Sequence, residues 1–125
     1  MSPVQRPLSG PALSFSLHDE MQTVRTELAK VSERIGRTLL KNGPLRVTLI
    51  GLKPGGALHE HRADGPITVQ VLEGSVRFQA AGQSWPLSQG SLLTLGNGEE
   101  HRVESDDGAL FLLTVVAHAS ELSAG

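Results

Sequence analysis

Residues 57–62 read ALHEHR, and residues 90–105 read GSLLTLGNGEEHRVES. The chain has five histidines, and three of them, His59, His61 and His101, lie in these two stretches. Successive side chains of a β-strand alternate between its faces, so a His-x-His pair on a strand projects both rings from one side. Two imidazoles on one face, joined by a third from another strand, form three corners of a metal site. The alternative interpretation is two solvent-facing histidines and an unrelated one.

Turn-forming residues divide the chain beyond Gly36 into short segments with the composition of strands. We predict strands over residues 37–40, 45–53, 57–61, 67–73, 75–81, 83–87, 91–95, 101–105 and 109–117. Gly, Pro, Asn and Asp lie between them and supply the backbone angles of tight turns. Short strands without interleaved helices predict an antiparallel sandwich or barrel.

One segment before these strands has helical periodicity. Its apolar residues follow one another in steps of three or four: Leu17, Met21, Val24, Leu28, Val31 and Ile35. Ser16, three residues before Asp19, resembles a helix N-cap, and Gly36 is a plausible stop. We therefore expect a helix over residues 17–35, lying on the rest of the domain or against a neighbouring subunit. Residues 1–16 are expected to be a flexible or extended arm, and residues 17–125 a single domain.

The two histidine stretches resemble the motifs of the cupin family over about residues 45–117. The matching residues are His59, His61 and Gly74 in the first motif, and Gly90, Gly98 and His101 in the second. The resemblance implies an all-β cupin double-stranded β-helix (jelly-roll barrel), here with an N-terminal amphipathic helix, and a metal site inside one end. Gly74 is expected to let two strands meet in a tight hairpin.

The family's glutamate ligand is missing, because its position is occupied by Ile67. The resemblance therefore implies a first shell of His59, His61 and His101, with open positions for water or substrate. Such a site suits one divalent transition metal: Fe, Zn, Ni, Cu or Mn. Without the carboxylate the site is more positive, which favours a small anionic ligand. Gln70 and Asp64 are weaker candidates for a further ligand.

Two functions follow from this resemblance, and the sequence does not decide whether the protein is an enzyme. The first is a metal-dependent enzyme of the dioxygenase or isomerase type that acts on a small anionic molecule. The alternative is a non-catalytic module that binds a small ligand or a metal, and a weaker third interpretation is a metal-free barrel with structural histidines. No catalytic residue is assigned. The inner wall is expected to be aliphatic, with contributions from Ile67, Val69, Val71 and Val103.

Composition excludes several other classes of function. The net charge is −2, with one Trp, no Tyr and three Phe, so nucleic-acid binding is not expected. There is no cysteine, which excludes disulfides and thiol chemistry and fits a cytoplasmic location. No apolar run reaches the roughly 18 residues of a membrane span. A small-molecule ligand or substrate and a homodimer, formed through sheet edges, are the expected partners.

Overall fold

The computed structural model describes residues 7–62, 65–96 and 98–117, except for the side chains of residues 60–62. The described chain begins with one helix, α1 (Leu17–Leu28), and continues in strands only. The strands are β1 (Arg34–Asn42), β2 (Leu45–Leu52), β3 (Ala57–Arg62), β4 (Ile67–Ala80), β5 (Gln83–Ser88), β6 (Leu92–Leu95), β7 (Glu100–Glu104) and β8 (Ala109–Val116). No described helix has the length and apolar composition needed to cross a membrane.

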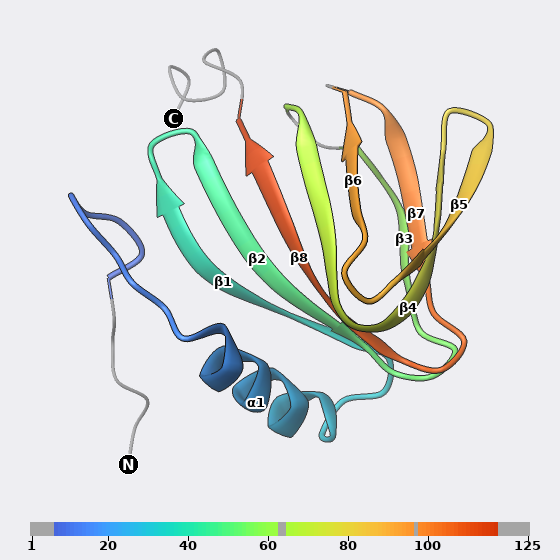
Figure 1. Cartoon of the computed structure of the whole chain (residues 1–125), viewed down its shortest axis with the longest axis horizontal. Helices are drawn as coiled ribbons and strands as arrows, with labels where there is room; N and C mark the ends of the chain where they lie inside the picture. The colour runs from blue at the N-terminus through green and yellow to red at the C-terminus, as the bar shows by residue number, and fades with distance from the viewer. Residues whose placement is uncertain (1–6, 63–64, 97, 118–125) are drawn as a thin grey trace.

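The strands form one curled antiparallel system that consists of two sheets sharing β4 (Figure 1). The first half of β4 pairs with β8 and β6, and its second half pairs with β5 and β7. Sheet A is therefore β1-β2-β8-β4-β6, and sheet B is β3-β7-β4-β5. In Figure 1 the sheets meet at the bottom, here called the narrow end, and diverge toward the top, here called the open end. The predicted all-β antiparallel barrel is confirmed.

Gly74 marks the point at which β4 passes from one sheet to the other. The predicted strands 67–73 and 75–81 are one strand of 14 residues, so the tight hairpin expected at Gly74 is wrong. Gly74 has a φ of 78°, and a Cβ on it would lie 2.3 Å from the carbonyl oxygen of Gly108. A residue without a side chain is required because the backbone turns a corner there against another loop.

The helix is capped as predicted but ends at Leu28 rather than Ile35. The Ser16 hydroxyl accepts a hydrogen bond from the backbone N–H of Asp19. Beyond Ala29 the next backbone N–H groups bond to carbonyls only three residues back, Lys30 to Glu27 and Val31 to Leu28, and this tighter turn leads into β1. Ile35 still packs in the cluster beneath the helix, but it does so from β1. The spacing of three or four residues between apolar side chains therefore continues from α1 into β1, although the helix itself does not.

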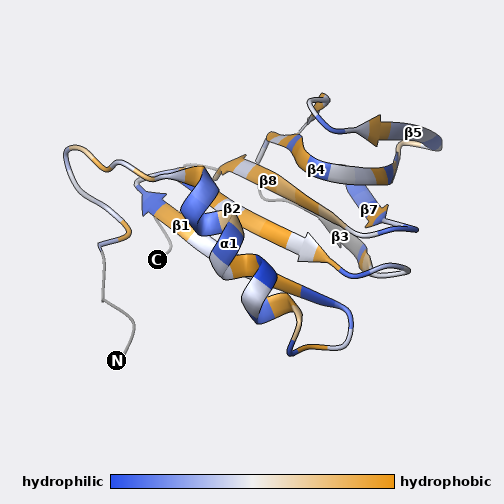
Figure 2. Ribbon diagram, turned by 60° about the horizontal axis from the view of Figure 1, so that its bottom comes forward, coloured by the Kyte–Doolittle hydropathy of each residue, from blue (hydrophilic) through white to orange (hydrophobic). Residues whose placement is uncertain are grey.

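Buried side chains lie on both faces of sheet A. The inner cluster fills the space between the sheets and consists of Ile50, Leu52, Ile67, Val69, Val71, Val76, Phe78, Ala80, Leu87, Val103, Ala109 and Phe111. The outer cluster lies under α1 and consists of Val24, Leu39, Leu49 and Leu110. Figure 2 shows hydrophobic residues along β2 and β8, and the helix lying across β1 and β2. The four aliphatic residues predicted for the inner wall are all buried, which confirms that prediction.

The described part of the N-terminal arm lies against its own chain. The backbone N–H of Lys41 donates to the carbonyl of Leu8 at 2.7 Å, and the Asn42 side-chain amide donates to the carbonyl of Gly10 at 3.0 Å. Phe15 packs against the outer cluster. Residues 7–16 are therefore attached to β1 and to the helix face.

Candidate functional site

His101 is held inside the barrel near the open end, where β7 begins. Val103, two residues further along β7, packs in the inner cluster, and Arg102 between them points outward. His101 therefore lies on the inner face of sheet B. The side chain is 2 % exposed, and its ring stacks on Phe78 with centroids 5.4 Å apart and planes at 13°. The Nδ1 atom lies 3.3 Å from the backbone carbonyl of Glu99, so a proton on Nδ1 is donated to that oxygen. The ring orientation is thus set by packing and by one backbone contact.

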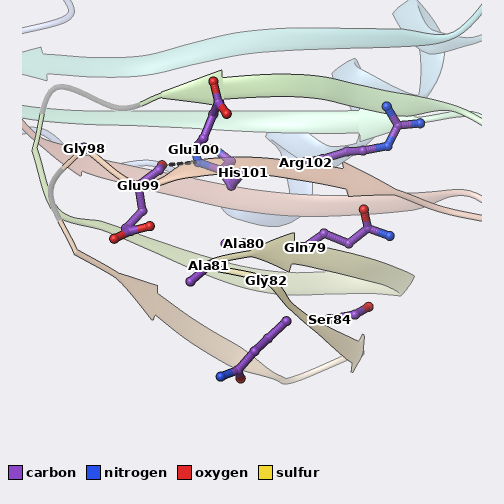
Figure 3. A pocket seen from close by; sticks show the side chains of 11 residues that line it. Gln79, Ala80, Ala81, Gly82, Ser84, Gly98, Glu99, Glu100, His101 and Arg102 are labelled. Carbon is purple, nitrogen blue, oxygen red and sulfur yellow. Dashed lines mark hydrogen bonds between the residues drawn. The ribbon is translucent and has the colours of Figure 1, made fainter.

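A cavity of about 770 Å³ opens beside His101 (Figure 3). It lies between the β4–β5 hairpin, residues 79–84, and the start of β7, residues 98–102. The lining residues come from both faces of sheet B. Gln79, Ser84 and Arg102 are in register on the outer face, Gln83 and His101 lie on the inner face, and Glu99 and Glu100 precede His101 at the rim. The cavity therefore combines hydrogen-bond donors and acceptors with both signs of charge.

His59 lies on the other face of sheet B because β3 has an irregularity. Leu58 pairs with Val103 and His61 pairs with His101, so β3 has one more residue than β7 between these pairs. The His59 ring is instead beside Arg102, with Nδ1 3.1 Å from the guanidinium, and its Nε2 is 3.7 Å from the Glu33 carboxylate. The His59 side chain is 58 % exposed.

His59 belongs to a row of charged side chains across the outer face of sheet B. Arg102 also contacts Glu104 at 3.3 Å, and Glu104 contacts Arg77 at 3.0 Å. Arg77 in turn pairs with Asp106. The hydrogen bond from Arg77 lowers the pKa of Glu104 most, and the hydrogen bond from Arg102 lowers it further. The Arg102 charge is therefore balanced by a carboxylate on its own face of the sheet.

Comparison with known families and structures identifies this architecture. Residues 53–123 match the model of the AraC-like ligand binding domain. The chain belongs to this family. Structural neighbours of the chain include cupins, so the cupin fold that the two motifs predict is confirmed. A search of curated proteins finds no match.

Solved structures share the fold at low sequence identity. A Rhizobium leguminosarum bv. viciae protein of unknown function is 18% identical, with a TM-score of 0.69, over 87% of this chain and 100% of that one. A cupin superfamily protein from Desulfitobacterium hafniense is 14% identical, with a TM-score of 0.67, over 70% and 80% of the two chains. A conserved Streptococcus pyogenes protein of unknown function is 22% identical, with a TM-score of 0.65, over 69% and 75%.

The described side chains of this cupin do not by themselves make a metal centre. Within the described residues, no three His, Asp or Glu side chains gather closely enough to hold an ion. The cationic guanidinium beside His59 opposes a second cation at that ring. The centre of His59, His61 and His101 stays a prediction, because the His61 side chain lies outside the described part. Its backbone does face that of His101 in the register.

Among the other candidate ligand positions, two are described by the structure and one is not. Gln70 is exposed on the outer face of sheet A, opposite Leu92 of β6. Ile67, at the family's glutamate position, is 2 % exposed in the inner cluster. Asp64 lies outside the described residues. The structure therefore gives no described side chain in place of the missing glutamate.

Sequence reasoning missed Arg46, which lies near the start of β2. Ile50 and Leu52 of this strand pack in the inner cluster, so regular alternation puts Arg46 on the same inner face. Its Nε atom is shielded from water and has no hydrogen-bond partner in the described part of the chain. The available signal was a charged residue in phase with the apolar face of a strand.

Proposed function

We propose that this protein is a non-catalytic cupin module that binds a small polar molecule at the open end of its barrel, against His101. The observation that carries the proposal is the cavity beside that buried imidazole. Cupin barrels that hold ligands do so in the space between their sheets, and the family to which the chain belongs is described by ligand binding. Binding without chemistry is favoured because the described lining has no nucleophile paired with a base.

The lining supports a ligand that both donates and accepts hydrogen bonds. Gln83, on the same face of sheet B as His101, offers a neutral donor and a neutral acceptor, and Glu99 offers an acceptor. Ligand sites of this size range orient their ligand with a few polar groups on a rigid wall. The rigid element here is β7, whose pairing with β4 fixes His101 opposite Ala80.

The proposal is tested by blocking the cavity from one side. Thermal unfolding of the full chain is measured against a panel of sugars, amino acids and small carboxylic acids, and each hit is followed by calorimetric titration. Gln83→Trp fills the cavity from β5 and should abolish the shift given by any hit. The control is Gln89→Trp, an exposed glutamine in the β5–β6 turn, outside the cavity lining. Equal binding by the two variants would refute the site.

A divalent metal centre is the second candidate, favoured by the pairing of His61 with His101 across β3 and β7. It would require the His59 ring to leave Arg102 and Glu33, or a centre without that residue. Metal analysis of untagged protein tests it. Close to one metal per chain, lost in both His61→Ala and His101→Ala, supports the centre, and the effect of His59→Ala decides between the two forms. Turnover of a small acid by the metal-loaded protein would further favour a metal-dependent enzyme over a binding module.

A further inference from the structure

Two cations lie side by side on the inner face of sheet A at the open end. Lys41 of β1 is the direct cross-strand partner of Arg46 of β2, and Arg46 is in turn paired with Val115 of β8. Directly paired residues project from the same face of a sheet, and like charges in this position repel. The β1–β2 turn next to them is at the open end in Figure 1. This arrangement costs stability unless a negative charge lies nearby.

No carboxylate fulfils that role within the described residues. The other arginines whose side chains are described each have an acidic partner: Arg25, Arg34, Arg37, Arg77 and Arg102. Neither Arg46 nor Lys41 has one in the same part of the chain, although acidic residues outnumber basic ones in the sequence. The buried Nε of Arg46 is also without an acceptor there. Arg46 as a whole is only partly buried, so a ligand can reach its side chain.

We propose that Arg46, assisted by Lys41, binds the oxyanion group of the ligand. A guanidinium presents parallel N–H donors that match the two oxygens of a carboxylate or a phosphate, and an oxyanion bound side-on accepts from Nε and one terminal nitrogen together. Lys41 contributes a second positive charge. The inference rests on the proposed function, since it assigns a charge to the molecule that enters the open end. Sheet A then recognises charge, while sheet B supplies the polar cavity.

The experiment uses the full chain and two defined probes, sodium phosphate and sodium benzoate, each compared with sodium chloride at equal ionic strength. We expect one or both probes to raise the melting temperature beyond the effect of chloride. Arg46→Met keeps an unbranched apolar stem and removes the charge. It should weaken binding about tenfold to a hundredfold in calorimetric titration, as expected for loss of a hydrogen-bonded charge. Without added anion, Arg46→Met should melt no lower than the parent, because it removes an unpartnered donor and the repulsion from Lys41.

Two control variants and the choice of probe make the result specific. Arg77→Gln removes an arginine from the outer face of sheet B and should leave the anion response unchanged. Lys41→Gln should weaken that response because it removes the second positive charge, whereas its matched control, Lys30→Gln, should not. A response to benzoate alone identifies a carboxylate ligand, and one to phosphate alone a phosphorylated ligand. An unaltered response in Arg46→Met overturns the inference, as does the absence of any effect beyond chloride. The Gln83→Trp comparison tests the cavity on the opposite sheet separately, so a failure of the proposed function can be told from a failure of this inference.

Discussion

The imidazole of His101 lies flat against the ring of Phe78, one strand away in sheet B. Phe78 is fully buried in the inner cluster. Its direct partner in the register is Val103, two residues after His101 in β7. The aromatic contact therefore joins the candidate site to the barrel core. A change in the core at this position is transmitted directly to the ring that faces the cavity.

Phe78→Ala should reduce the free energy of unfolding by about 3–5 kcal/mol, because it removes a buried aromatic side chain and leaves a cavity. Chemical denaturation of the two proteins measures the difference. The control is Leu92→Ala, where a side chain that is 67 % exposed is truncated, and it should change stability by no more than about 0.5 kcal/mol. Similar losses in both variants would contradict the assigned core.

Gly74→Ala should destabilise the chain much more than Gly82→Ala. Both glycines have a positive φ, 78° and 73°, which costs an L-residue about 1–2 kcal/mol. A Cβ on Gly82 would meet nothing within 4 Å, whereas one on Gly74 would collide with the Gly108 backbone. Urea unfolding of the pair separates strain from collision. Equal effects would show that the corner of β4 yields more readily than its geometry indicates.

The ion pair between Arg25 of α1 and Glu73 of β4 makes the helix attachment sensitive to pH. The hydrogen bond from Arg25 lowers the pKa of Glu73 below its usual value. Its stabilising contribution is therefore full above the unfolded pKa of glutamate and is lost as the pH falls through the lowered folded value. Both side chains are more than a third exposed, so the contribution is about 0.2–1 kcal/mol.

Glu73→Gln tests this contribution. Its unfolding free energy should fall below that of the parent at neutral pH and approach it in acid, and the difference at neutral pH should shrink with added salt. Glu27→Gln, on the exposed side of the same helix, serves as the matched variant. A constant difference across the whole pH range would rule out the ion pair as its source.

Ser16→Ala should cost about 1 kcal/mol, because the Asp19 backbone N–H loses its acceptor at the start of α1. Ser14→Ala, at an exposed position before the helix, should be close to neutral. Unfolding curves followed by far-ultraviolet circular dichroism compare the two. Equal stability of both variants would show that the cap is not formed in solution.

Much of the fold could be predicted from the turn residues and the period of the apolar ones. The limits of β2, β5 and β8 lie within a residue of those predicted, because Gly or Pro stands on both sides of β2 and β5 and Gly108 precedes β8. The prediction erred where tertiary packing decided. Gly74 supports either a hairpin or a strand crossing between sheets, and only its approach to Gly108 distinguishes them. Ile35 fits a helical stripe and a strand equally well.

The candidate site was less accessible to sequence reasoning than the fold. His101 lies on the inner face as expected, since its strand alternates regularly. The position of His59 depended on the same alternation, which the extra residue between Leu58 and His61 interrupts. Whether Arg46 has an acidic partner depends on which residues lie across the barrel, and no local sequence pattern carries that information. The metal, the homodimer and the cytoplasmic location remain predictions.

Membership of β4 in both sheets has a consequence for how this protein can vary. Its 14 residues supply hydrogen bonds to four other strands, so a cut or insertion near Gly74 would disconnect the two halves of the molecule at once. The loops at the open end do not connect the two sheets in this way. Under the proposed function, changes of length in the β4–β5 and β6–β7 connections would alter ligand preference while the shared strand keeps the scaffold intact, so these connections are where new selectivity would be engineered.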